Sequence, residues 1–115
     1  MRVKGGIVTR KRHKKVLELA KGFRGSRHRL FRTAKEAVLH AGQYAFAGRK
    51  LRKRDMRSLW ITRLSGVLEA QGIAYSRFIN NLKVKNITLN RKVLSEIANS
   101  DPKTFEQIVA ATRAQ

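Results

Sequence analysis

The chain has 115 residues, with 27 Lys and Arg against seven Asp and Glu, a formal net charge of +20 and no cysteine. This length suits one domain with an extension, and the lack of cysteine excludes a disulfide framework, a thiolate zinc site and a cysteine nucleophile. No apolar run approaches the ~20 residues that span a bilayer, and no apolar core follows the basic N-terminus, so we expect neither a membrane span nor a secretory signal.

The charge is concentrated in the first half of the chain. Residues 1–57 hold 19 Lys and Arg against three acids, a net of +16, whereas residues 58–115 hold eight against four, a net of +4. The positive charges of this half-chain repel one another, so we expect it to bind a dense polyanion. Nucleic acid is the leading candidate, because binding to its phosphates releases condensed counterions, which is favourable. A solvated disordered tail is the weaker alternative, because this half is not low in complexity and carries helical patterning.

The first elements are a short helix and a turn. Residues 1–9 are predicted to be extended, because Gly5 and Gly6 oppose helix formation. Thr9 is the candidate N-cap of a helix over residues 10–21, and Gly22 is expected to end it as the C′ residue. Residues 22–27 are then predicted to form a turn. Their Gly-x-x-Gly pattern also matches the loop of KH domains, but that short motif needs flanking strands, which this sequence does not predict.

A long helix is predicted from about residue 27 to residue 71, where apolar side chains recur at helical spacing without proline. Residues 27–58 alone would extend roughly 48 Å, more than the ~26 Å diameter of a compact domain of about 100 residues. The helix should therefore project from the body or break near Gly48. Its residues 49–57 carry basic side chains all round the helix, which suits insertion between nucleic-acid segments better than docking on one surface.

The second half has the pattern of a small helical domain. Gly72 is expected to end the long helix, and residues 87–89 alternate like an extended connection. Asn90 is the predicted cap of one helix, and Asp101 with Pro102 is a strong start signal for the last. We therefore predict an all-α fold, with a long basic N-terminal helical extension (1–57) followed by a small α-helical globular domain (58–115). Its core should contain Trp60, Ile61, Leu64, Val67, Leu68, Phe78, Ile79, Leu82, Val93, Leu94, Ile97, Ala98, Phe105, Ile108 and Val109.

The sequence predicts no catalytic residue, metal site, cofactor or small-molecule substrate. No two of the seven acids have i,i+3 or i,i+4 spacing, the three histidines are dispersed, and P-loop, GxSxG and GxGxxG motifs are absent. RNA is favoured over DNA, because the basic half has neither a dimerisation zipper nor a compact helix-turn-helix. A DNA-compacting or membrane-active cationic protein remains the alternative. Four aromatic residues interleave with the basic ones and are candidates for stacking on bases or for packing: Phe23, Phe31, Tyr44 and Phe46.

Several sequence blocks occur in the order and spacing of one family. They are Arg12-His13-Lys14-Lys15, Leu19-Ala20-Lys21-Gly22-Phe23-Arg24-Gly25, Ala41-Gly42-Gln43-Tyr44-Ala45, Arg52-Lys53-Arg54, Leu59-Trp60-Ile61, Tyr75-Ser76-Arg77-Phe78-Ile79-Asn80 and Asn90-Arg91-Lys92. Over almost its whole length the chain closely resembles the ribosomal protein L-twenty family of the bacterial large subunit. Three departures are Gly5, where many relatives are basic, residues 64–67, which replace a more alanine-rich stretch, and Asn81. Asn81 replaces a glycine, and asparagine tolerates the left-handed backbone that we expect there.

The resemblance implies a non-enzymatic protein whose basic extension threads into large-subunit (23S-type) ribosomal RNA and supports early assembly of that subunit. It also implies neighbouring large-subunit ribosomal proteins as partners and a cytoplasmic ribosome, bacterial or in a plastid stroma, as the location. Some members of the family repress translation of their own operon by binding its messenger RNA. Arg77, Lys83, Lys85, Arg91 and Lys92 are the basic candidates for that second surface.

Together, composition and resemblance give one set of candidate RNA-binding residues. They are Arg2, Lys4, Arg10, Lys11, Arg12, His13, Lys14, Lys15, Lys21, Arg24, Arg27, Arg29, Arg32, Lys35, Tyr44, Arg49, Lys50, Arg52, Lys53, Arg54, Arg57, Arg63, Arg77, Lys83, Lys85, Arg91 and Lys92.

Overall fold

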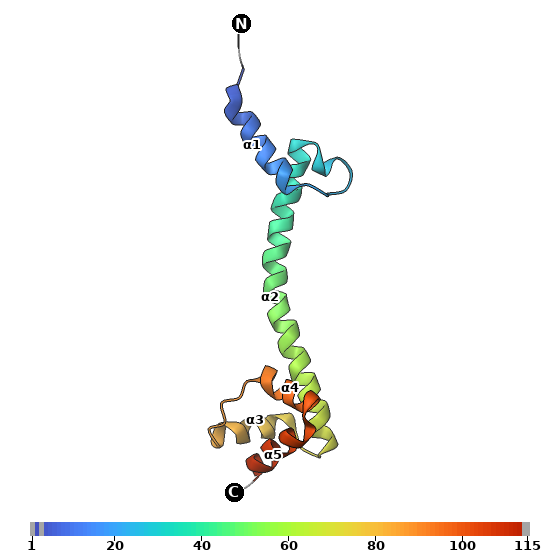
Figure 1. The fold of residues 1–115 in the computed structure, drawn as a ribbon, viewed down its shortest axis with the longest axis vertical. Helices are drawn as coiled ribbons and strands as arrows, with labels where there is room; N and C mark the ends of the chain where they lie inside the picture. Colours follow the sequence, from blue (N-terminus) through green and yellow to red (C-terminus); the bar gives the residue numbers. More distant parts are fainter. Residues whose placement is uncertain (1, 3, 114–115) are drawn as a thin grey trace. The chain divides into compact units, whose positions relative to one another are not determined.

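The computed structural model describes residue 2 and residues 4–113, and this part of the chain is helical without strands. In chain order the elements are α1 (Gly6–Leu19), the 3-10 helix η1 (Gly25–His28), α2 (Phe31–Ala70), α3 (Tyr75–Val84), α4 (Arg91–Ser100) and α5 (Pro102–Arg113) (Figure 1). The all-α prediction is confirmed. Contacts between Cα atoms group the chain into two units, Met1–Lys50 and Leu51–Gln115. The boundary predicted between residues 57 and 58 stays a prediction.

Helix α1 begins earlier than the sequence predicted. Gly5 precedes it with a φ of 78°, and Gly6, its first residue, has a φ of 57°. Glycine adopts this left-handed backbone without the steric cost that other residues have. The two glycines thus form the turn into the helix instead of keeping residues 1–9 extended, and Thr9 lies inside the helix rather than capping it. Residues 1 and 3 of that predicted segment lie outside the described part.

Helix α1 ends at Leu19, two residues before the predicted end, and Gly22 lies two residues after the C-cap instead of directly after it. Ala20 is the C-cap, its carbonyl accepts a hydrogen bond from the Phe23 N–H at 3.1 Å, and Gly22 has a left-handed φ of 85°. Residues 25–28 then make the single 3-10 turn η1, where the Nδ1 of His28 lies 2.9 Å from the Phe23 carbonyl oxygen. Because η1 occupies this turn, α2 begins at residue 31 and not at residue 27.

Unit 1 has very little buried apolar surface. Among its described residues only Ala20 and Ala34 are buried, and both are small. The ring of His13 in α1 stacks on the ring of Phe31 at the start of α2, with 3.7 Å between centroids. Since stabilisation scales with the apolar area removed from water, about 25 cal/mol per Å², unit 1 gains little from burial.

Helix α2 continues through Gly42 and Gly48, which excludes a break near Gly48, one of the two alternatives that the sequence left open. A glycine inside a helix costs at most about 1 kcal/mol relative to alanine, which good helix formers on both sides can offset. Every residue from 39 to 59 is exposed. About six turns of this helix, which we call the uncovered part of α2, therefore present their side chains to solvent.

Unit 2 is built around a true hydrophobic core. Helices α3, α4 and α5 gather around the C-terminal end of α2 (Figure 1). The rings of Phe78 and Phe105, both buried, lie 5.9 Å apart in a tilted arrangement. The buried core residues are Leu64, Leu68, Phe78, Leu82, Leu94, Ala98, Phe105 and Val109. All eight were predicted from their helical spacing.

Two helices of unit 2 end in the same way. Gly72, with a φ of 71°, follows α2, and the Ile73 N–H donates to the Leu68 carbonyl at 2.9 Å, as in a Schellman motif. The same hydrogen-bond pattern closes α3, with Asn86 at a φ of 55° in the glycine position. The left-handed conformation expected at Asn81 is wrong, because Asn81 lies inside α3. Asn86, five residues later, is the residue that makes the turn.

Both predicted N-caps of unit 2 are confirmed. The Oδ1 of Asn90 accepts a hydrogen bond from the Val93 N–H at 2.9 Å. At the start of α5, Asp101 accepts from the hydroxyl and from the backbone N–H of Thr104. The hydroxyl first and the N–H second hold the pKa of Asp101 below its usual value of 3.8. These local bonds fix where α4 and α5 begin.

The core placement predicts unequal effects for two matched substitutions in α2. Leu68 is fully buried and Leu51, in the same helix, is 50% exposed. Leu68→Ala should lower the free energy of unfolding by about 2–5 kcal/mol, because it leaves a cavity. Leu51→Ala should change it by less than about 0.5 kcal/mol. Urea unfolding followed by circular dichroism measures both, and equal losses would contradict this core.

Candidate nucleic-acid interface

The candidate RNA-binding residues are at the surface. All of them are exposed except His13 and Arg91, which are half-buried. Arg2 and Lys4 precede α1, and the others lie on α1, in the segment between α1 and α2, along α2, and on α3 and α4 with their connections. The exposed candidates are therefore accessible to a ligand.

In unit 1, the turn of residues 22–27 and the first part of α2 line an open hollow of about 810 Å³. Arg24 and Arg27 contribute from the turn, and His40 and Tyr44 contribute from α2, with Glu36 as the acidic member. Both arginines belong to the candidate RNA-binding residues. The structure brings these arginines together with an aromatic ring, Tyr44, that is 73% exposed.

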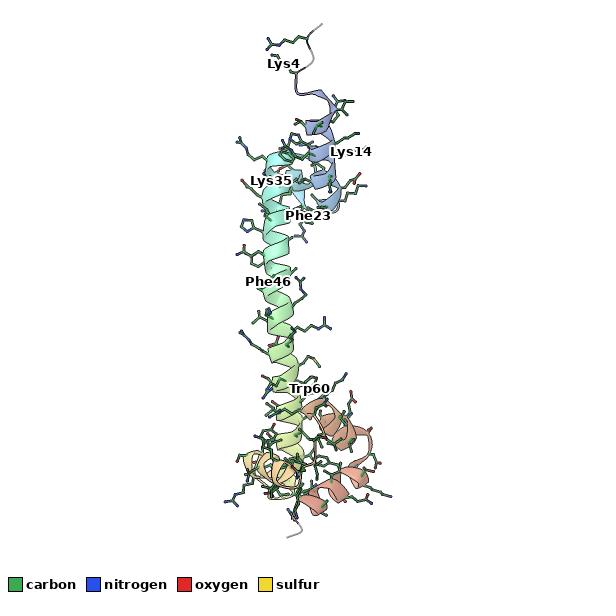
Figure 2. The ribbon with its side chains drawn as sticks, turned by 90° about the vertical axis from the view of Figure 1, so that its left-hand side faces the viewer. Lys4, Lys14, Phe23, Lys35, Phe46 and Trp60 are labelled. Carbon is green, nitrogen blue, oxygen red and sulfur yellow. The ribbon has the colours of Figure 1, made fainter. Side chains whose placement is uncertain are left out.

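The four aromatic candidates divide into two pairs. Phe23 and Phe31 are half-buried, and Phe31 packs on His13 inside unit 1. Tyr44 and Phe46 are exposed, Phe46 by 60%, and Figure 2 labels Phe46 on α2. The Nζ of Lys50 lies 5.6 Å from the centroid of the Phe46 ring, within the range of a cation–π contact. The second pair is therefore the one available for stacking on bases.

The densest basic stretch lies in the uncovered part of α2. Its cations are Arg49, Lys50, Arg52, Lys53, Arg54 and Arg57, all exposed, with Asp55 as the one acid among residues 49–57. Successive residues of an α-helix are rotated by ~100°, so these charges surround the helix. The same stretch exposes Leu51 and Met56, by 50% and 37%. Such a surface, charged on all sides with apolar side chains between, suits a partner that surrounds it.

Unit 2 has a second basic feature, which we call the Trp60 hollow. It is an open hollow of about 440 Å³ between α2 and the start of α4. Trp60 is labelled in Figure 2. The residues that line the hollow are Lys53, Arg54, Arg57, Trp60, Asn90, Arg91 and Lys92.

The core position predicted for Trp60 is wrong. Trp60 is half-buried and is not part of the core cluster. It begins the apolar stripe of α2, where its neighbour is the polar start of α4 rather than the apolar interior of the bundle. Sequence periodicity places a residue on a face of a helix but does not say how far the covering helices extend.

Arg91 is the candidate whose side chain the structure fixes. Its Nε donates a hydrogen bond to the Tyr75 hydroxyl at 2.8 Å, which ties α4 to α3. Of the five residues proposed for a messenger-RNA surface, Arg91 and Lys92 line the Trp60 hollow. The other three, Arg77, Lys83 and Lys85, do not. Three cations of α2 that sequence reasoning had assigned to the extension, Lys53, Arg54 and Arg57, join this hollow instead.

Residue 2 and residues 4–113 show neither a metal-ion cluster nor a helix that could span a membrane. Within that part, His, Cys, Asp and Glu side chains do not assemble into groups of three or more that could hold a metal ion. None of the described helices combines the length and the apolar character needed to cross a membrane. The chemistry that remains on this surface is that of cations and aromatic rings.

Comparison with known proteins identifies the family. Residues 2–108 match the sequence model described as Ribosomal protein L20. The chain is similar to the large ribosomal subunit protein bL20 of Caldanaerobacter subterraneus subsp. tengcongensis, with 55% identity over 114 residues (99% of this chain, 96% of the relative). The protein of the same name from Alkaliphilus metalliredigens is 54% identical over 112 residues (97% of this chain, 94% of the relative). The one from Staphylococcus carnosus is 52% identical over 113 residues (98% of this chain, 96% of the relative). The chain thus belongs to the ribosomal protein L20 family of the large ribosomal subunit, which is not a family of enzymes.

Proposed function

We propose that this protein is a structural component of the large ribosomal subunit that binds 23S-type ribosomal RNA directly and supports early assembly of the subunit. The observation that carries the proposal is the uncovered part of α2, where every residue from 39 to 59 is exposed and cations surround the helix. The curated relatives are named as proteins of the large ribosomal subunit. Neighbouring large-subunit proteins are the expected protein partners.

The proposed mechanism is electrostatic. RNA segments that converge in a folded ribosomal RNA repel one another through their phosphates, and a helix charged on all sides lowers that repulsion for several segments together. Each phosphate neutralised also releases condensed counterions, which makes binding favourable and dependent on salt. Tyr44 and Phe46 add stacking surfaces along the same helix. The candidate residues of α1, of the turn before η1 and of α2 are the contacts that we propose for this extension.

Competition binding across a salt series tests this function. Large-subunit ribosomal RNA fragments should form a complex with the full chain that persists at salt concentrations where transfer RNA and duplex DNA no longer bind. The reason is that shape-matched contacts add to the common electrostatic term, whereas non-specific binding consists almost entirely of that term. Equal affinity for all three nucleic acids, with the same steep salt dependence, would instead indicate a generic polycation that compacts DNA.

We further propose translational repression of the chain's own operon as a second function, located in unit 2. Unit 2 has its own hydrophobic core and its own basic hollow, so it can be tested for RNA binding without residues 1–50. A fragment containing residues 51–115 should therefore bind the leader of the operon messenger RNA and discriminate against a scrambled leader of equal length. Equal binding to both leaders by a folded fragment would contradict this second function.

A further inference from the structure

We infer that the Trp60 hollow is a binding site for one unstacked nucleotide of RNA, with its base on the Trp60 ring and its phosphate among the surrounding cations. The inference rests on the proposed RNA-binding function and names the ligand of one site within it. It is carried by the residues that line the hollow, by the way those residues are held, and by the position of two of them in α4.

The charge in the hollow is unbalanced. Five of the seven lining residues are cations: Lys53, Arg54, Arg57, Arg91 and Lys92, with no acid among the seven. Charges of one sign that gather around a concave, low-dielectric surface reinforce one another and attract an anion. The hollow therefore has the electrostatics of a phosphate site.

The N-terminus of α4 also favours a bound anion, for a separate reason. Arg91 and Lys92 are the first two residues of α4, and its first turn contains no acidic residue. The N-terminus of a helix carries a partial positive charge and exposes N–H groups, so cations there are unfavourable and anions favourable. Two cations at this end are opposed by the helix dipole unless an anion lies beside them. A phosphate in the hollow would neutralise the two cations and would also interact favourably with the helix dipole.

Several of the lining groups are already held in place. The Oδ1 of Asn90 is fixed by the Val93 N–H, and the Nε of Arg91 is fixed by the Tyr75 hydroxyl at 2.8 Å. An arginine has five N–H donors, so four of them in Arg91 remain for a phosphate. Groups that are ordered before binding lose less entropy when the ligand arrives, and this favours affinity.

The aromatic ring distinguishes a nucleotide from a simple anion. Trp60 is half-buried, lies outside the core and is the single tryptophan of the chain. A base has a flat face that stacks on such a ring, whereas a phosphate alone gains nothing from it. The volume of about 440 Å³ lies within the range of about 300–1,000 Å³ of small-ligand sites.

Fluorescence of Trp60 in the full-length, unsubstituted protein tests the inference directly, because all tryptophan emission comes from this one site. A short single-stranded oligoribonucleotide should quench the emission at saturation. An abasic oligomer with the same sugar-phosphate backbone should bind more weakly and leave the emission almost unchanged. Inorganic phosphate serves as the third probe, and it should compete without quenching.

Substitutions separate stacking from charge. Trp60→Leu should weaken binding of the oligoribonucleotide roughly tenfold, measured by anisotropy of labelled RNA, and should hardly affect the abasic oligomer. Trp60→Phe should restore most of the loss, because a ring remains. Lys92→Ala should weaken binding of both oligomers, whereas Lys103→Ala, which removes an equal charge from an exposed position of α5, should have little effect. Thermal unfolding of each variant checks that the body remains folded.

Two results would overturn the inference. If saturating oligoribonucleotide leaves Trp60 emission unchanged, or if the abasic oligomer quenches it equally, the hollow holds no stacked base. If the chain still binds ribosomal RNA fragments selectively in that case, the proposed function stands and the nucleotide site alone is wrong. If the chain shows no preference for those fragments, the proposed function fails first.

Discussion

Repulsion among the like charges of an exposed helix is the main physical constraint on the stability of this chain. Residues 1–57 carry a net charge of +16, and every residue from 39 to 59 is exposed. A solvated helix usually carries charges of both signs, which stabilise it through pairs one turn apart. Here Asp55 is the only acid between residues 49 and 57. We therefore expect the RNA proposed as the ligand to contribute to the free energy that orders this helix.

The two units are stabilised in different ways. Unit 2 excludes water from apolar side chains of four helices, and its helix ends are closed by side-chain caps and by left-handed residues such as Gly72 and Asn86. Unit 1 buries only Ala20 and Ala34 among its described residues, with one ring stack between α1 and α2. Ordering a residue costs about 1–2 kcal/mol of backbone entropy, which burial this small does not offset. The ribosomal RNA that we propose as the partner would cover what the chain leaves exposed and so add the missing stabilisation.

The sequence predicted those features that depend on neighbouring residues or on regular spacing. Caps at Asn90 and Asp101 are local hydrogen bonds, and the eight core residues follow helical periodicity, so both were predictable. Features that depend on which other elements pack over a residue were not predictable. Trp60 lies on the predicted face of α2 but beyond the bundle interior, and the hollow that it lines joins residues more than thirty positions apart. Glycine was misjudged at residues 5 and 6, which start a helix, and the sequence left open whether Gly48 interrupts one, which it does not.

Hydrogen exchange of the protein with and without a large-subunit ribosomal RNA fragment tests the central claim most directly. In the free protein, amides of α1 and of residues 39–50 should exchange at nearly the rate of an unfolded chain, while amides of the unit 2 core are protected. Binding of the RNA should protect the first group and change the second much less. Strong protection of residues 10–57 in the free protein would contradict the account, because it would show that this helix is stable without a polyanion.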